Sequence, residues 1–470
     1  MSFPILSGNV ATATAATGYD VANSCRFNDG DSAAMSRDQS ANDAGTNTKG
    51  TLSVWLKMSA AGTEQVIYTR ETDASNYFKV WFENDKLLIQ TVTSGSVTMK
   101  KETNRVFRDP GAWLNIVVIL DSTDGTAADR QQIWVNGTRE TSFANSTNIG
   151  SSANLQINTG TGTDYIGRRG SGNYYDGYMA EFVWIDGTDY AATSFGEYNE
   201  DSPNIWQPID VSGLTFGTNG FYLDFEASDN LGNDANGGTD LTEANLAAVD
   251  QCTDSPTNNF ATWNSLIYSN GSTAQANASY TTSNSSSNYG YRLSTIGVAS
   301  GKWYAEVKYT SSSNQALIGI RSREATGVSH YLGYYDDDYA IYVDGHYYNN
   351  NSETTNSNAS WTNGDIIGIF LDLDNNKLYF SKNGSLYSST GISITAAAST
   401  ETGFYFFSAS EWNSSGNGTF ELNTGNPSFT LSSAVNDGDY GNFEYTTTIT
   451  GDGASKTFKA LNTKNLAEYG

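Results

Sequence analysis

The sequence predicts an all-β protein that contains two antiparallel β sandwiches in tandem, and three observations support this prediction. Aromatic residues reach 13% of the 470 residues, which is enough to close β-rich cores. Glycine occurs 46 times and proline 6 times, so tight turns are frequent and rigid linkers are scarce. Short aromatic or β-branched runs recur between turns of Gly, Asn, Asp and Ser, a pattern typical of sandwiches.

The first block of predicted strands occupies residues 21–200. Its apolar runs are residues 53–57, 65–68, 78–82, 86–89, 113–120, 133–137 and 178–185. Turn residues follow each run closely, and long helical periodicity is absent. This spacing predicts a first antiparallel sandwich.

The second block occupies residues 266–430, with its clearest runs at residues 301–307, 316–320, 366–371 and 377–380. The Asn383-Gly384 pair after the last of these runs predicts a hairpin turn with two positive-φ residues. We expect the rest of the chain to comprise a docking segment (residues 1–20), a connector (residues 201–265) and a C-terminal β extension (residues 431–470). Residues 241–249 of the connector should form one or two helical turns.

Charge and composition exclude several classes of protein. The 25 basic and 51 acidic residues give a net charge of −26, which repels a phosphate backbone, so we expect no nucleic-acid partner. Cys25 and Cys252 cannot form a four-ligand zinc site, and we expect buried free thiols. His330 and His346 are the only histidines, which leaves little for a histidine-based triad. The chain has no signal-peptide pattern and no apolar run of 18 residues, so we expect no membrane insertion.

The first block resembles a laminin-G-like, concanavalin A-like jelly roll over about residues 20–200. The matching pieces, in order, are Arg26-Phe27-Asn28, Met35-Ser36-Arg37, residues 51–56, Trp113-Leu114-Asn115-Ile116, residues 133–137, Tyr165-Ile166-Gly167-Arg168 and residues 175–182. The second block resembles a SPRY domain, itself a concanavalin A-like sandwich. Its matching pieces are residues 301–307, Ile318-Gly319-Ile320, residues 364–368, residues 371–374, residues 378–384 and residues 420–429.

The join between the blocks, residues 254–264, and the ending at residues 459–466 are similar to segments of bacteriophage virion proteins. This resemblance implies a non-enzymatic virion surface protein, a tail fibre or spike, that presents lectin-like domains for attachment to a host-surface glycan. The alternative is a capsid or tail decoration protein, or cement protein, with a structural role only. The implied location is the virion surface, which becomes extracellular after lysis.

The expected partners are a host cell-surface glycan, other virion proteins and further copies of the chain. Virion fibres are usually trimers, so the resemblance implies three copies. Residues 10–17 are small and uncharged, which favours docking over a solvated tail, although termini are commonly disordered.

A glycoside hydrolase on such a sandwich would need two carboxylates at usable spacing on one strand. A strand with the pattern Glu-x-Asp-x-x-Glu would provide them, and the nearest approach is Glu71-Thr72-Asp73. Asn76 occupies the sixth position, where the second glutamate of the pattern is required. We therefore predict no catalytic residues and no enzymatic activity.

The sequence predicts no cofactor, with calcium left as an open alternative. Asp336-Asp337-Asp338 supplies clustered oxygens, and so does the loop that holds Asp121, Asp124 and Asp129. The competing interpretation of each is a solvated turn. The segment from Asp372 is not an EF-hand, because Lys377 occupies the glycine position and Asn383 the final glutamate position.

Aromatic side chains are the best candidates for ligand binding, because sugar faces stack on rings while acids and amides accept hydroxyl hydrogen bonds. They gather in the second block around the Asp344-Gly345 turn, with both histidines nearby. The candidate ligand-binding residues are Tyr331, Tyr334, Tyr335, Asp336, Asp337, Tyr347, Tyr348 and Trp412. The alternative is that strand alternation turns half of these tyrosines into the core.

Overall fold

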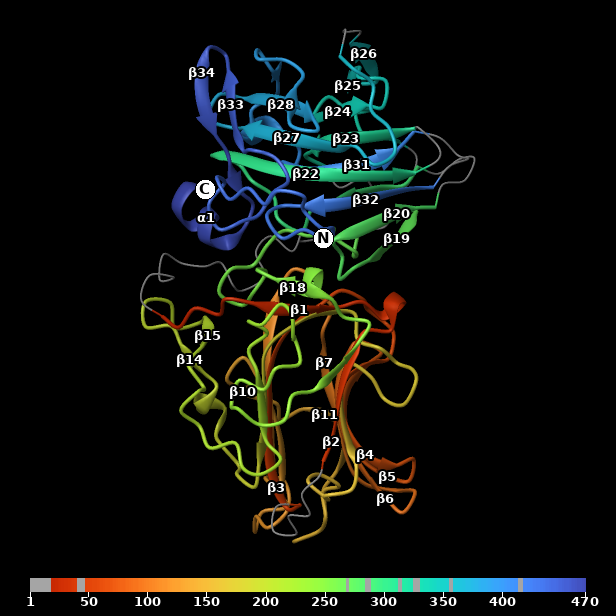
Figure 1. Ribbon diagram of the computed structural model, residues 1–470, viewed down its shortest axis with the longest axis vertical. Helices are drawn as coiled ribbons and strands as arrows, with labels where there is room; N and C mark the ends of the chain where they lie inside the picture. Colours follow the sequence, from red (N-terminus) through yellow and green to blue (C-terminus); the bar gives the residue numbers. More distant parts are fainter. Residues whose placement is uncertain are drawn as a thin grey trace. The chain divides into compact units, whose positions relative to one another are not determined.

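The computed structural model describes residues 18–39, 47–267, 270–283, 289–311, 315–323, 330–354, 358–412 and 417–470. The predicted docking segment therefore lies almost wholly outside the described residues. The chain divides into two compact units, of which the first extends to Thr257 and the second comprises Asn258–Gly470 (Figure 1). With 45% strand and 5% helix, and antiparallel sheets, the structure confirms the all-β prediction.

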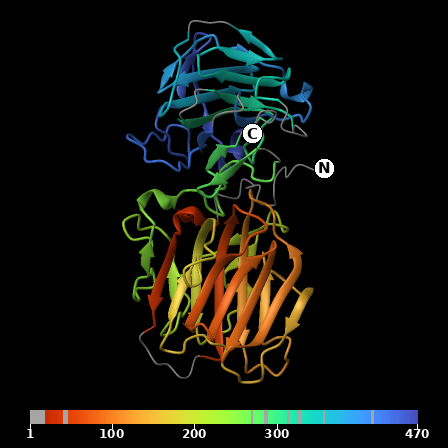
Figure 2. The ribbon, with the colours of Figure 1, turned by 90° about the vertical axis from the view of Figure 1, so that its right-hand side faces the viewer.

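The first unit contains two eight-stranded sheets. In spatial order, the first sheet consists of β10 (Thr138–Arg139), β9 (Gln131–Val135), β8 (Trp113–Asp121), β3 (Lys49–Met58), β13 (Gly177–Asp186), β1 (Ser24–Phe27) and β18 (Gln251–Cys252), with β16 (Phe221–Leu223) beside β13. The second consists of β11 (Phe143–Thr147), β7 (Ser96–Val106), β6 (Lys86–Thr93), β5 (Asn76–Glu83), β4 (Gln65–Asp73), β12 (Thr163–Ile166), β2 (Ala34–Asp38) and β17 (Thr242–Ala244). Figure 2 shows the second sheet nearly face-on.

Alternation along the strands divides the apolar residues of the first sheet between two faces. Ile116 and Val118 of β8 point into the core between the sheets, whereas Val117 and Ile119 point outward. The chain covers this outer face itself with apolar residues that include Phe195 and Phe216. A short pair of strands, β14 (Gly196–Tyr198) and β15 (Trp206–Pro208), belongs to the covering segment.

The segment expected as a connector contributes strands to the first unit. β16 pairs with β13, β17 with β2, and β18 with β1. The prediction of helical turns at residues 241–249 was wrong. Thr242–Ala244 instead hydrogen-bonds to the free edge of β2, and only a 3-10 helix, Ala248–Asp250, follows, so tertiary pairing overrode local propensity.

Both cysteines are free and buried, as predicted. They lie on the neighbouring strands β1 and β18. No helix in the described ranges is long and apolar enough to cross a membrane.

The second unit contains a nine-stranded and a six-stranded sheet. The nine-stranded sheet consists of β19 (Gly271–Ala274), β20 (Ser279–Thr282), β32 (Gly418–Asn423), β22 (Lys302–Ser311), β27 (Ile366–Asp372), β28 (Lys377–Lys382) and β29 (Ser385–Leu386), with β30 (Ile392–Ser393) beside β28 and β35 (Lys459–Ala460) beside β22. The six-stranded sheet consists of β21 (Tyr291–Leu293), β31 (Phe406–Glu411), β23 (Ala316–Arg321), β24 (Asp338–Tyr342), β25 (Tyr347–Asn349) and β26 (Ser352–Thr354).

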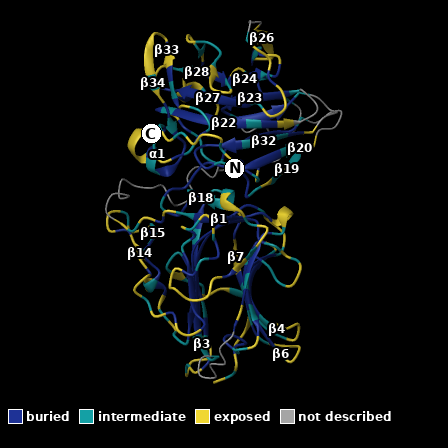
Figure 3. Ribbon diagram, viewed as in Figure 1, coloured by how far each residue is buried: buried dark blue, intermediate teal, exposed yellow. Residues whose placement is uncertain are grey.

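The predicted Asn-Gly turn is confirmed: Asn383 and Gly384, between β28 and β29, have φ values of 47° and 78°. The core between the two sheets is almost fully buried, and β22 and β27 are dark blue along most of their length in Figure 3. The C-terminal extension adds a hairpin, β33 (Thr448–Gly451) with β34 (Ala454–Thr457), and a short helix, α1 (Thr463–Tyr469). It packs on the nine-stranded sheet of its own unit, where Phe443 and Phe458 contact the cluster that contains Tyr304 and Phe370.

Candidate functional site

The outer face of the six-stranded sheet carries a cluster of aromatic side chains. Alternation along β24 turns Tyr339 and Ile341 into the core and leaves Ala340 and Tyr342 on the outer face. Leu317 of β23 shares that outer face. The segment before β24 supplies Tyr331 and Tyr334, which cover part of this apolar base. Together with aromatic residues from other segments they form a cluster that we call the aromatic face: Tyr289, Tyr331, Tyr334, Tyr342, Tyr348 and Trp412.

Trp412 is the centre of the aromatic face. Its ring centroid lies 3.9 Å from that of Tyr331, 5.2 Å from that of Tyr348 and 5.8 Å from that of Tyr342. Tyr331 and Tyr348 are nearly buried, at 7% and 8% exposure, whereas Tyr334, Tyr342 and Trp412 are half-buried. The face therefore presents accessible ring surface on a packed base.

Hydrogen bonds hold the covering segment against the sheet. The Tyr331 hydroxyl donates to Asn351 Oδ1 at 2.6 Å, and the backbone N–H of Leu332 donates to Ser410 Oγ at 3.0 Å. Burial raises the pKa of Tyr331 to about 12, so its hydroxyl remains a donor at neutral pH. Gly333, with φ 96°, allows a close approach, because a Cβ there would lie 2.7 Å from the Cβ of Tyr348.

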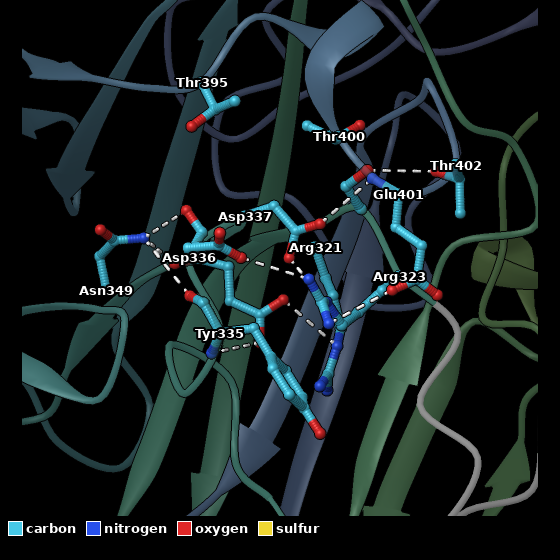
Figure 4. A network of polar contacts seen from close by, with 12 residues as sticks. Arg321, Arg323, Tyr335, Asp336, Asp337, Asn349, Thr395, Thr400, Glu401 and Thr402 are labelled. Carbon is cyan, nitrogen blue, oxygen red and sulfur yellow. Dashed lines mark hydrogen bonds and ion pairs between the residues drawn. The ribbon is translucent and has the colours of Figure 1, made fainter.

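A network of charged side chains lies next to Tyr335 (Figure 4), and the Tyr335 ring is 5.1 Å from that of Tyr334 in the aromatic face. The Arg323 guanidinium pairs with Asp337 at 2.7 Å, and with Asp336 and Glu401 at 3.2 Å each. The same guanidinium lies 4.2 Å from the centroid of the Tyr335 ring, within cation–π range. Asp336 and Asp337 therefore anchor this end of the segment through Arg323.

A buried ion pair lies under the network. Arg321 Nε is 3.3 Å from Asp338 Oδ1, and both side chains are fully buried. Burial raises the pKa of Asp338, although the charge of Arg321 opposes the shift. Burial, followed by the charge of Arg321, also lowers the pKa of His330, whose ring stacks on Tyr334 at 3.7 Å.

The structure brings four of the predicted ligand-binding residues together, places three in the adjoining arginine network and turns the eighth to the opposite face of the sheet. Tyr331, Tyr334, Tyr348 and Trp412 belong to the aromatic face. Tyr335, Asp336 and Asp337 lie in the arginine network. Tyr347 lies on the opposite face of β25, where its ring stacks on Phe380 at 5.9 Å, as the alternation argument allowed.

Sequence reasoning missed two members of the aromatic face and the arginines beside it. Tyr342 could have been found from strand alternation, because it directly follows the buried Ile341 and must therefore lie on the opposite face of β24. Tyr289 had no local signal, because it reaches Tyr331, 5.8 Å away, only through the fold. Arg321 and Arg323 alternate along one strand end, but their acidic partners come from a later segment.

Possible metal ligands converge in one place among the described residues. One donor atom from each of Asp344, His346 and Glu353 lies within 4.8 Å of the others. The loop acids of the first unit have separate partners instead: Asp121 pairs with Lys49 at 2.8 Å, and Asp129 pairs with Arg139.

The comparisons with known proteins assign both sandwiches. Residues 28–188 match the family model of the concanavalin A-like lectin/glucanases superfamily, of the laminin G type, and residues 302–423 match that of the SPRY domain. No curated protein matches the chain.

Solved structures resemble parts of the chain at low identity. The SPRY domain of human HERC1 is 20% identical, with 31% of this chain and 86% of that chain covered and a TM-score of 0.26. A human SPRY domain is 18% identical, with 31% and 91% covered and a TM-score of 0.25. A heptameric SAP-like pentraxin from Limulus polyphemus is 12% identical, with 36% and 78% covered and a TM-score of 0.26.

The family matches agree with the two β sandwiches and with both domain resemblances in the sequence. Domains of these two kinds are typically non-catalytic binding domains. The chain therefore carries a concanavalin A-like domain of the laminin G type followed by a SPRY domain.

Proposed function

We propose that the protein is a non-enzymatic bacteriophage virion surface protein, a fibre or spike, that attaches to glycans on the host surface through the aromatic face of its SPRY domain. The observation that carries the binding role is the half-buried Trp412 ring, which packs against tyrosine rings on a buried apolar base. Flat rings with polar tips suit the apolar faces and hydroxyl groups of sugars. The virion location is supported by the sequence resemblance of the join and the C-terminal tail to phage virion proteins.

Charge around the aromatic face favours neutral sugars over acidic ones. Asp344 and Glu353 are exposed at its edge, and Glu353 accepts a hydrogen bond of 3.0 Å from the Tyr348 hydroxyl. The whole chain carries a net charge of −26. A carboxylated or sulfated glycan would meet repulsion at this edge, so we expect neutral glycans to bind.

A non-enzymatic role is supported by the state of the acids that come nearest to a hydrolase motif. Glu71 lies in β4 and pairs with Arg169 at 3.3 Å, and Asp73 accepts hydrogen bonds from Ser75 and Asn76 in the hairpin turn. These acids serve local structure. A polysaccharide-degradation assay with the full chain should therefore release no reducing ends.

A glycan array with the full chain tests the binding role. The intact protein should bind a set of neutral glycans. Trp412→Ala should weaken the affinity by at least about tenfold, which corresponds to the loss of roughly 1.4 kcal/mol from one ring–sugar contact. Tyr440→Ala is the matched control, because Tyr440 is 51% exposed and lies in the C-terminal segment. Equal binding by Trp412→Ala and the intact chain would refute the proposed surface, and an empty array would leave the structural decoration or cement role as the better account.

The proposed location has its own test. Mass spectrometry of purified virions should detect the chain as a particle component, together with its proposed partner virion proteins. Light scattering of the purified chain should give a homo-oligomer, with three copies expected. Absence from virions would refute the attachment role and the decoration role together.

A further inference from the structure

Three potential metal ligands meet where the hairpin of β24 and β25 adjoins β26. The register pairs Tyr348 with Glu353, and His346 immediately precedes β25, so the strand pairing brings Glu353 close to the end of the turn that holds Asp344. His346 Nδ1 lies 3.5 Å from Asp344 Oδ2 and in direct contact with Glu353 Oε1. One imidazole nitrogen therefore faces two carboxylate oxygens.

Each carboxylate is held through one oxygen and directs the other at the imidazole. Asp344 Oδ1 accepts a hydrogen bond of 2.9 Å from the backbone N–H of His346, so that Oδ2 faces the imidazole Nδ1. Glu353 Oε2 accepts the hydroxyl of the nearly buried Tyr348 at 3.0 Å, which leaves Oε1 toward Nδ1. Such outer hydrogen bonds are what orients ligating carboxylates in metal sites.

A hydrogen bond alone does not account for this arrangement. The Nδ1 atom carries at most one proton, so it can donate to only one of the two carboxylates. The two carboxylates also repel one another in a chain with a net charge of −26. A divalent cation would accept a lone pair from all three atoms and neutralise both charges.

We propose that Asp344, His346 and Glu353 bind a divalent transition-metal ion of the Zn²⁺ type. An imidazole nitrogen with carboxylate oxygens suits Zn²⁺, whereas Ca²⁺ and Mg²⁺ take oxygen ligands. The side chains of Asp344, His346 and Glu353 are 44%, 23% and 42% exposed, so the fourth position opens to water. The bound ion would also fix Glu353, and through it the Tyr348 hydroxyl of the aromatic face.

Isothermal titration calorimetry with ZnCl₂ and the chelator-treated full chain tests this site. The intact protein should bind one Zn²⁺ per chain, and His346→Gln and Glu353→Gln should each weaken binding by more than about tenfold. Tyr348→Phe keeps the ring and both carboxylates, so it should weaken binding by about tenfold or less. CaCl₂ should not compete at equal concentration.

His330→Gln is the control, because it removes the other histidine of the chain and should leave the Zn²⁺ isotherm unchanged. Thermal unfolding gives a second readout: Zn²⁺ should raise the melting temperature of the intact chain and not that of His346→Gln. The substituted side chains are partly exposed, and near-ultraviolet circular dichroism without metal checks that the variants fold. An intact chain without saturable Zn²⁺ binding, or a His346→Gln chain that binds as tightly as the intact one, would overturn the proposal.

Discussion

Both outer faces of the SPRY sandwich carry apolar side chains, but one face is completely covered and the other stays partly exposed. On the nine-stranded sheet, Tyr304 and Phe370 point outward, and Phe443 and Phe458 of the C-terminal extension bury them completely. On the six-stranded sheet, Leu317 and its neighbours also point outward, but the aromatic face that covers them stays half-exposed. Strand alternation thus creates apolar surface on both sides, and the covering segment decides which side remains open to a ligand.

The covering residues explain the difference. Phe443 and Phe458 have no polar atoms in their side chains, so water contact brings them no compensation. Tyrosine and tryptophan can bury one edge of the ring and keep a polar tip in water, which is why they are common in binding surfaces. The comparison therefore predicts that substitutions on the nine-stranded side affect stability, whereas those on the aromatic face affect binding.

The largest effect is expected for Phe458→Ala. Phe458 is fully buried, and its ring lies 5.2 Å from that of Phe370. Deleting a buried phenylalanine leaves a cavity and typically costs about 3–5 kcal/mol. Denaturant unfolding should show this loss for the second unit, while the glycan profile of the folded variant stays unchanged. A loss of unfolding free energy as small as that of a surface substitution would mean that the extension does not cover this sheet tightly.

Glu306 should make the free energy of unfolding depend on pH, by about 3 kcal/mol. This residue lies on β22 and hydrogen-bonds to the C-terminal extension. Its carboxylate accepts hydrogen bonds from the hydroxyl of Tyr304 (3.1 Å), the amide of Asn423 (3.0 Å) and the backbone N–H groups of Glu444 (3.0 Å) and Tyr445 (2.8 Å). Burial nevertheless raises its pKa from 4.5 to about 7. The folded state then binds the proton more tightly than the unfolded state, so the contribution is present below pH 4.5 and is lost as the pH rises through 7.

The free energy of unfolding should be measured for the intact chain and for Glu306→Gln between pH 4.5 and 8. The stability advantage of the intact chain should shrink across this interval and then level off. An advantage that grows with pH would mean that the four donors outweigh burial and favour the carboxylate. A constant difference would mean that folding does not change the pKa of Glu306.

Trp412→Ala should cost about 2 kcal/mol in stability, less than Phe458→Ala. Trp412 is half-buried, and the substitution removes its packing against three tyrosine rings, at 3.9, 5.2 and 5.8 Å, where an aromatic pair is worth about 0.5–1.5 kcal/mol. Denaturant unfolding checks the cost. A loss comparable with that of Phe458→Ala would make Trp412 a core residue and remove the contrast between the two faces.

The smallest effect, about 0.5–1.5 kcal/mol, is expected for Tyr331→Phe. This change deletes the hydroxyl that donates to Asn351 Oδ1 at 2.6 Å and keeps the ring against Trp412. Thermal unfolding should show the small loss, and the intact ring should preserve glycan binding. A variant as stable as the intact chain would show that the Asn351 contact does not hold the covering segment.

Much of the fold follows from short-range patterns. The apolar composition of residues 316–320 and 366–371 predicted two core strands, and the isoleucines Ile318, Ile320, Ile367 and Ile369 within them are fully buried. The helical expectation at residues 241–249 failed because Thr242–Ala244 pairs with β2, a distant strand that no local window contains. Of the candidate site, the sequence located the tyrosine-rich region, and it missed Tyr289, which joins the aromatic face from another segment of the chain.

By itself, the sequence determined the strands, the Asn-Gly turn at Asn383-Gly384, the burial of both thiols and the two sandwich families, because these depend on residue type and on neighbours along the chain. Only the tertiary structure decided that Tyr348 faces outward while Tyr347 faces Phe380, since one residue of register exchanges the two faces of a strand. It also decided that Trp412 meets Tyr331 and that Glu353 meets His346, because strand pairing sets those distances. The sequence therefore identified which side chains could bind a ligand. Which of them lie together depended on which strands hydrogen-bond to one another.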